Sequence, residues 1–152
     1  MVENSDNNSL CQIPFTEARL IYLIDNELDI LDFLEELFIS LNFKVKTFCD
    51  CNEALLNLRN DNPDIIISEV KLPKMNGLEF IEYLEVNELK IPIIFMPGIL
   101  TEEIMLHSNT CKPFAIIEKP FDFGSLFSTC LSALGYSQKE VNYLMAETIN
   151  LL

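Results

Sequence analysis

Five predicted strands alternate along the chain with five segments of helical periodicity. Most of these strands are continuous apolar runs rather than alternating ones, which indicates that both of their faces are buried. Strands of this kind are typical of a parallel sheet that has helices packed on each side. The pattern therefore predicts an α/β fold, in which a five-stranded, doubly wound parallel sheet forms the middle of three layers.

The boundaries of these elements follow from apolar spacing and capping residues. The strands are predicted at 20–24, 44–48, 65–67, 91–96 and 115–117, and the first three helices at 27–41, 52–60 and 78–89. Thr101 is a predicted cap for the fourth helix, because two carboxylates follow it at the positive helix end. Asp122 or Ser125 begins the fifth helix, which is expected to run to about Leu134 and to end at Gly135.

Two further segments flank the predicted domain, which covers residues 18–136. Residues 1–17 are rich in Asn, Ser and Asp and are expected to form a flexible leader. Residues 137–152 predict an extra amphipathic helix, with Ser137 and Glu140 spaced as a capping box. Its apolar stripe has two open interpretations: it packs back on its own domain, or it meets a partner or a second copy.

Composition excludes several classes of function. The net charge is −14 and no segment is rich in Lys or Arg, which argues against nucleic-acid binding. No apolar run is long enough to span a bilayer, and no secretory signal is recognisable. The odd count of five cysteines indicates a reducing cytoplasm. Cys49 and Cys51 are expected to be ordinary thiols, and His107 a surface or packing residue.

Charged residues follow three of the predicted strands, and a proline follows a fourth. Asp25, Glu69, Pro97 and Lys119 stand directly after, or two residues after, the first, third, fourth and fifth apolar runs. In a doubly wound sheet the functional crevice lies outside the carboxyl ends of the strands. The sequence therefore predicts a site at this edge, with two acids and a lysine in it.

Four segments in combination carry a resemblance to a known family: LIDNE (23–27), PDIIISE (63–69), MNGLE (75–79) and EKPF (118–121). Over about residues 18–136 the chain resembles the receiver domain of bacterial two-component response regulators. The resemblance implies a flavodoxin-like (βα)5 fold. It also implies a site in which a kinase phosphorylates one Asp with the help of Mg²⁺, which two acids after the first strand help to hold.

This chain departs from the family at the residues that handle phosphate. Glu69 stands where the phosphoacceptor Asp is expected, and its additional methylene moves the nucleophilic oxygen by about 1 Å, which can cost roughly a hundredfold in rate. Asp25 matches the first metal-binding acid, but Asn26 replaces the second, and Glu27 is expected to point elsewhere. Mg²⁺ binding is expected to be weak or absent, with Asp25 and Glu69 as its ligands if it occurs.

The resemblance also assigns the remaining positions of the pocket. Lys119 matches the family's lysine and is expected to form an ion pair with the acids, while Pro120 is a candidate for a cis bond. Pro97 replaces the Ser or Thr whose hydroxyl binds the phosphoryl group, and proline has neither a hydroxyl nor an N–H to donate. Ile116 replaces the aromatic residue that rotates on activation in many receivers.

These departures favour a stand-alone, non-enzymatic, atypical receiver, or pseudo-receiver, that binds a protein without phosphate control and needs no cofactor. The partner is expected to be a histidine kinase, an output protein or a second copy in a homodimer. It would bind through the face of the fourth helix, fifth strand and fifth helix, or through the C-terminal helix. Glu69 could imitate the phosphorylated state with its fixed charge.

Three alternatives stay open. The chain could be a functional receiver that a histidine kinase phosphorylates with Mg²⁺, or the polar cluster could be a structural remnant. An unrelated doubly wound enzyme is disfavoured, because neither a glycine-rich phosphate loop nor a nucleophile with its base is recognisable.

Overall fold

The computed structural model describes residues 19–149, so the predicted leader and residues 150–152 lie outside the described part of the chain. Strands and helices alternate as the apolar pattern predicts. The strands are β1 (Leu20–Ile24), β2 (Lys44–Phe48), β3 (Ile65–Ser68), β4 (Ile93–Phe95) and β5 (Ala115–Ile116). The helices are α1 (Leu28–Ser40), α2 (Cys51–Asn57), α3 (Gly77–Val86), α4 (Glu102–Thr110), α5 (Phe123–Ala133) and α6 (Gln138–Ile149).

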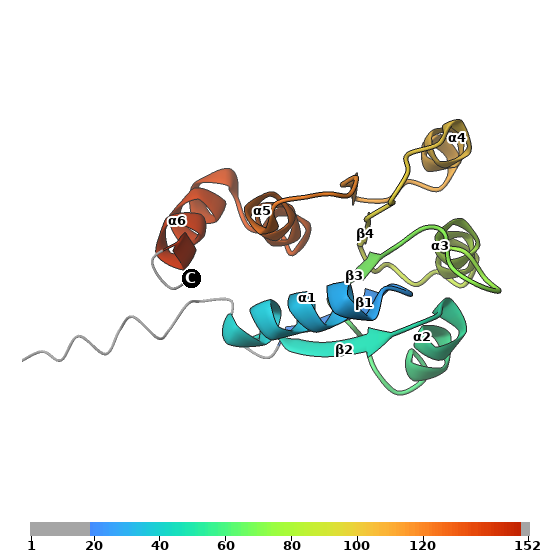
Figure 1. The fold of residues 1–152 in the computed structure, drawn as a ribbon, viewed down its shortest axis with the longest axis horizontal. Helices are drawn as coiled ribbons and strands as arrows, with labels where there is room; N and C mark the ends of the chain where they lie inside the picture. Colours follow the sequence, from blue (N-terminus) through green and yellow to red (C-terminus); the bar gives the residue numbers. More distant parts are fainter. Residues whose placement is uncertain (1–18, 150–152) are drawn as a thin grey trace, which may run out of the picture.

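The five strands form one parallel sheet in the order β2-β1-β3-β4-β5. Because β1 lies between β2 and β3, the chain reverses its direction across the sheet after β2, and helices come to lie on both faces. Figure 1 shows α2, α3 and α4 along one side of the sheet, with α5 and α6 on the other. The predicted flavodoxin-like, doubly wound fold with an extra C-terminal helix is confirmed.

Alternate residues of the inner strands enter two separate apolar layers, because successive side chains of a strand point to opposite faces. In β1, Ile21 and Leu23 pack with α1, α5 and α6. Tyr22 and Ile24 pack on the other face with α2, α3 and α4. The continuous apolar runs in the sequence therefore correspond to strands that are buried on both sides.

The two outer strands are less buried than the inner ones. β2 exposes Lys44 and Lys46, as its alternating pattern predicts. The Lys46 ammonium donates to the Asp61 carboxylate, and this bond holds the pKa of Asp61 below its usual range. The continuous run at 115–117 predicts full burial of the fifth strand, but Ala115 and Ile116 are only half-buried. This prediction is wrong because β5 is an outer strand, with a neighbour on one edge only.

Side-chain caps begin the later helices, as their sequences indicate. The Thr101 hydroxyl accepts from the Ile104 N–H at the start of α4. Asp122 accepts from the Ser125 N–H and thereby begins α5, which decides between the two predicted starts. These caps satisfy backbone donors that have no partner within the helix.

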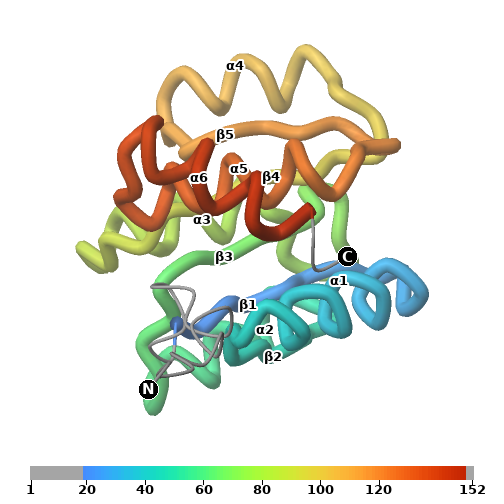
Figure 2. The backbone as a smooth tube through the Cα atoms, turned by 90° about the vertical axis from the view of Figure 1, so that its left-hand side faces the viewer, coloured from blue at the N-terminus to red at the C-terminus, as the bar shows by residue number. Residues whose placement is uncertain are grey.

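Helix α6 packs back on its own domain, alongside α5 (Figure 2). Val141, Leu144 and Thr148 are buried, and the first two join the apolar layer formed by α1 and α5. In the predicted capping box the Glu140 carboxylate accepts the Ser137 backbone N–H, and the Ser137 hydroxyl accepts the Glu140 backbone N–H. Of the two interpretations of the C-terminal stripe, the structure therefore favours packing within the domain. Between residues 19 and 149, no helix is both long and apolar enough to cross a membrane.

Candidate functional site

Three polar side chains that are distant in sequence meet at the carboxyl edge of the sheet. Asp25 follows β1 directly, Glu69 follows β3 directly, and Lys119 lies three residues beyond β5. Because β1 and β3 are paired in parallel register, Asp25 and Glu69 leave the sheet side by side. We call these three side chains the acid–lysine pocket.

The Lys119 ammonium lies between the two carboxylates. Its Nζ atom is 2.7 Å from Asp25 Oδ2 and 2.9 Å from Glu69 Oε2. Asp25 is fully buried, Glu69 is 5% exposed and the Lys119 side chain is 12% exposed. Ion pairs between charged groups this well shielded are screened by water far less than pairs at a surface.

The second oxygen of each carboxylate accepts a backbone N–H. Asp25 Oδ1 accepts from Glu27 at 2.9 Å, and Glu69 Oε1 accepts from Val70 at 2.8 Å. Within residues 19–149, every buried side-chain nitrogen or oxygen has a hydrogen-bond partner. All four carboxylate oxygens of the pocket therefore already have a donor from the protein itself.

Burial and ion pairing act in opposite directions on Lys119. Burial alone would lower the pKa of this lysine, because desolvation disfavours the charged ammonium. The hydrogen bonds and charges of Asp25 and Glu69 outweigh that effect and raise the pKa above its ordinary value. Lys119 is therefore a permanent cation at neutral pH.

Glu27 is close to the pocket, contrary to the expectation from its position in the sequence. Its Oε1 atom lies 3.7 Å from Lys119 Nζ, although the Glu27 side chain remains largely exposed. The extended backbone at Glu27, directly before α1, brings its carboxylate back over the lysine. A third acid therefore stands at the rim, whereas the preceding Asn26 is exposed.

The remaining predicted positions lie on the two loops and the strand that lead to the lysine. Pro97 is buried, and its carbonyl accepts the Lys119 backbone N–H at 2.9 Å. Ile116 is half-buried in β5, and the Lys119–Pro120 peptide bond is cis. The side chains at 97 and 116 have no polar atom with which to contact a charged group in the pocket.

The residues present do not fit Mg²⁺ as they are arranged. Mg²⁺ requires near-octahedral oxygen ligands at about 2.0–2.1 Å. The oxygens of Asp25 and Glu69 that face the pocket are already bonded to an ammonium. Across residues 19–149, no group of three or more His, Cys, Asp or Glu side chains is arranged to hold a metal ion.

A further carboxylate, that of Glu118, joins the two loops beside the pocket. Glu118 Oε2 accepts the Leu100 backbone N–H at 2.8 Å. With the bond from Lys119 N–H to the Pro97 carbonyl, this contact joins the β5–α5 loop to the β4–α4 loop. Sequence reasoning missed Glu118, because an exposed acid between a strand and a lysine has no distinctive pattern.

The turn after β3 requires a glycine at residue 77. A Cβ atom there would lie 2.9 Å from Phe95 Cε1, 3.0 Å from the Glu69 carbonyl oxygen and 3.1 Å from Val70 Cα. We expect Gly77→Ala to lower the free energy of unfolding by about 1–3 kcal/mol, because two of these neighbours are backbone atoms that cannot move aside. Urea unfolding checks this value.

Gly98 provides the matched control. A Cβ atom at this position meets only Glu69 Oε2, at an ordinary contact distance of 3.8 Å. Gly98→Ala should change stability by no more than about 0.5 kcal/mol. Equal losses in both variants would show that crowding at Gly77 is not the cause.

The described cysteines have free thiols. Cys49 is exposed, while Cys51, Cys111 and Cys130 are buried. Burial raises the pKa of Cys51 to about 12, so its thiol is protonated at neutral pH. These cysteines behave as the ordinary thiols that the sequence predicts.

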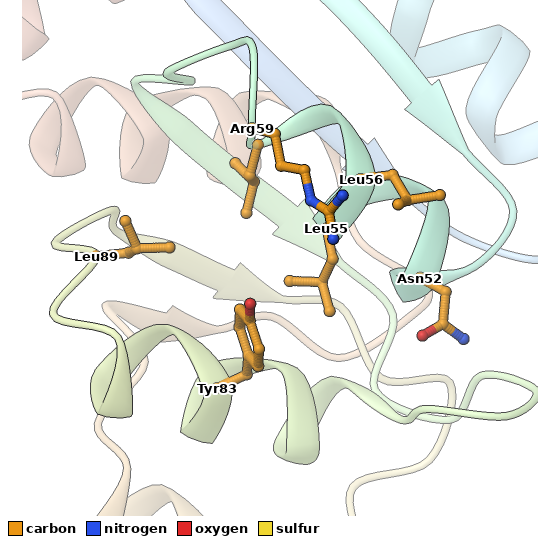
Figure 3. Close-up of a pocket in the computed structure, with 7 residues that line it drawn as sticks. Asn52, Leu55, Leu56, Arg59, Tyr83 and Leu89 are labelled. Atoms are coloured by element: carbon orange, nitrogen blue, oxygen red, sulfur yellow. The ribbon is translucent and has the colours of Figure 1, made fainter.

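An apolar hollow of about 380 Å³ lies between α2 and α3, away from the acid–lysine pocket. Figure 3 shows Tyr83 of α3 facing Leu55 and Arg59 of the α2 segment across it. The sequence did not predict this hollow, because apolar spacing indicates which face of a helix is buried but not the gap between two helices. The lining residues are Asn52, Leu55, Leu56, Leu58, Arg59, Tyr83 and Leu89.

Comparison with known proteins shows the family to which the chain is related. The family model for the response regulator receiver domain matches residues 21–130. The regulatory protein AtoC of Escherichia coli (strain K12) is 24% identical over 131 residues, which cover 85% of this chain and 28% of that protein. The response regulator SaeR of Staphylococcus aureus (strain USA300) is 28% identical over 101 residues, which cover 66% of this chain and 44% of that protein. The chain spans less than half the length of these relatives.

Solved structures share the fold. A CheY-like receiver domain from Methanospirillum hungatei JF-1 superposes with a TM-score of 0.74 at 23% identity, covering 81% of this chain and 98% of that one. The chemotaxis protein CheY4 of Vibrio cholerae gives a TM-score of 0.70 at 22% identity, with 76% and 98% coverage. The region that the family model matches runs from β1 into α5 and contains the whole acid–lysine pocket. The chain therefore belongs to the response regulator receiver domain family, whose members are signalling modules of two-component systems.

Proposed function

We propose that this receiver domain acts as a phosphorylation-independent protein-interaction module in two-component signalling. The observation that carries the proposal is the Lys119 ammonium between Asp25 and Glu69, at 2.7 and 2.9 Å. The pocket that receives a phosphoryl group in the family is here closed by contacts among its own side chains. An interaction that needs no phosphate is the function that such a pocket supports best.

Two features beside the ion pairs support the same conclusion. Both carboxylate oxygens of Glu69 accept hydrogen bonds, one from Lys119 and one from the Val70 N–H, and these bonds hold the side chain in place and make its oxygens weaker nucleophiles toward phosphorus. Pro97 has no hydroxyl to bind a phosphoryl oxygen, which removes the usual link between phosphorylation and the β4–α4 loop. A phosphoryl group would therefore meet a weakened acceptor and no hydroxyl at residue 97 to relay its presence.

The proposed interaction surface is the face of α4, β5 and α5. Exposed apolar side chains gather in the β4–α4 loop, on α4 and just before β5, while the stripe of α6 is covered within the domain. Glu102, Glu103 and Glu118 are exposed in the same segments, so the surface favours a partner with apolar and cationic side chains. The exposed apolar residues are Ile99, Leu100, Met105, Leu106 and Phe114.

The bonds of the two adjoining loops support a surface held in a single conformation. Glu118 holds the Leu100 backbone at 2.8 Å, and Leu100 is itself one of the exposed apolar residues. A histidine kinase, an output protein or a second copy of this chain could each supply the complementary surface. Such a partner would bind without a switching step.

Titration with Mg²⁺ and beryllofluoride, a phosphoryl mimic, tests this function. We expect no saturable change in the amide NMR signals of residues around Glu69 and Lys119, because the acceptor and the cation position are already engaged. Glu69→Asp should behave in the same way, since Pro97 and Asn26 remain. A receiver domain with Asp at the acceptor position is the positive control.

Saturable shifts around Glu69 in the unmodified chain would overturn the proposal. They would favour the alternative of a functional receiver that a histidine kinase phosphorylates with Mg²⁺. Shifts in Glu69→Asp alone would show that the single methylene, and not the rest of the pocket, prevents phosphorylation.

A further inference from the structure

A cation already occupies the centre of the acidic site at the carboxyl edge of the sheet. Two buried carboxylates each direct one oxygen at Lys119 Nζ and the other at a backbone N–H. Glu27 supplies a third carboxylate at 3.7 Å, on the exposed side of the ammonium. Three negative charges therefore surround one positive charge.

The ammonium is held from its backbone as well as from its tip. The Lys119 N–H donates to the Pro97 carbonyl at 2.9 Å, so the side chain enters the pocket from a fixed position. Only 12% of the side chain is exposed. The ammonium is thus part of the folded core of the site and differs from a surface lysine that samples many rotamers.

A divalent ion would compete directly with this ammonium. It needs the oxygens that Asp25 and Glu69 now direct at Lys119, and at a shorter distance. If the lysine stayed in place, two cations would lie a few ångströms apart in a site with little water to screen them. If the lysine left, its buried ion pairs would be lost.

We propose that the Lys119 ammonium is the resident cation of this site, so that the unmodified chain compensates one of the two negative charges of the Asp25–Glu69 pair without a metal ion. This inference rests on the proposed function, in which the pocket no longer handles phosphate. It has a direct consequence for variants of residue 119. Removing the positive charge leaves the buried carboxylates of Asp25 and Glu69 without a counter-charge, which a proton or a divalent cation can then supply, and Glu27 can move in from the rim as a further ligand of a divalent ion.

Titration of the full chain with Mn²⁺ tests this inference, with free Mn²⁺ measured by electron paramagnetic resonance. The chains compared are the unmodified protein, Lys119→Met and Lys119→Arg. We expect Lys119→Met to bind one Mn²⁺ at least about tenfold more tightly than the unmodified chain. Lys119→Arg keeps the positive charge and should show no such gain. Mg²⁺ should displace the bound Mn²⁺.

Equal Mn²⁺ affinity in the unmodified chain and Lys119→Met would overturn the inference, as would an equal gain in Lys119→Arg. If Lys119→Met is unfolded without metal, its folding is followed by circular dichroism while Mn²⁺ is added. Recovery of the folded spectrum on adding Mn²⁺ supports the resident-cation role, and an unfolded spectrum at every Mn²⁺ concentration contradicts it.

The two proposals fail in distinguishable ways. Tight Mn²⁺ binding by the unmodified chain, without any beryllofluoride-dependent shift, overturns the resident-cation inference and leaves the proposed function standing. A saturable beryllofluoride adduct in the unmodified chain overturns the proposed function itself.

Discussion

Replacing Lys119 with methionine is expected to lower the free energy of unfolding by about 3–5 kcal/mol in the absence of divalent ions. Methionine has a similar length but no charge, so Asp25 and Glu69 lose their shared partner while they stay buried. A buried carboxylate without a counter-charge carries a large desolvation penalty. Urea unfolding at neutral pH measures the loss.

Lys112→Met is the matched control, because Lys112 is an exposed lysine outside the acid–lysine pocket. This control should change stability by no more than about 0.5 kcal/mol. The raised pKa of Lys119 provides a second test, in which the stability of the unmodified chain is measured as a function of pH. Its stabilising contribution is complete below the ordinary value of 10.5 and is lost as the pH rises through the higher folded value. A loss below about 1 kcal/mol in Lys119→Met would mean that the pocket behaves like a surface ion pair.

Phe38→Ala is expected to cost about 3–5 kcal/mol of the free energy of unfolding. Phe38 lies on α1, is fully buried and packs against three other rings. Its ring centroid is 5.4 Å from Phe123, 5.7 Å from Phe43 and 6.4 Å from Phe127. Truncation leaves a cavity where α1 meets α5, and the fixed sheet below prevents the helices from closing it. Thermal or urea unfolding detects the loss.

Phe33→Ala is the control for this substitution on the same helix. Phe33 is 55% exposed, so its removal leaves no internal cavity and should cost much less than the change at Phe38. Comparable losses at the two positions would contradict the placement of Phe38 in a closely packed layer between α1 and α5.

The architecture could be predicted because it depends on local patterns. Continuous apolar runs identify strands buried on both faces, and Thr101 and Ser137 mark helix starts through hydrogen bonds within their own first turn. The partial exposure of β5 could not be predicted from local patterns. It depends on strand order, and a short apolar run such as 115–117 looks the same at the centre and at the edge of a sheet.

The core of the site was also predictable, since the carboxyl ends of parallel strands meet at one edge. That rule brings Asp25, Glu69 and Lys119 together. It does not describe side chains on the loops. Glu27 turns back toward Lys119, and Glu118 reaches the Leu100 backbone, through loop conformations that periodicity does not encode.

The apolar stripe of α6 likewise has one feature that the sequence predicts and one that it does not. Its spacing predicts a helix with one buried face, and Val141 and Leu144 are buried accordingly. The stripe alone cannot indicate which surface covers it, because a neighbouring helix and a foreign partner present similar apolar side chains. The contact with α5 is a property of the folded chain as a whole.

The lysines of β2 have a consequence for aggregation. An outer strand offers unpaired backbone groups on which another chain can build a sheet, and exposed lysines on such a strand oppose this. Lys44 and Lys46 place two charges there, and Lys46 is anchored to Asp61. Fibrils formed by strand addition are therefore disfavoured at this edge of the sheet.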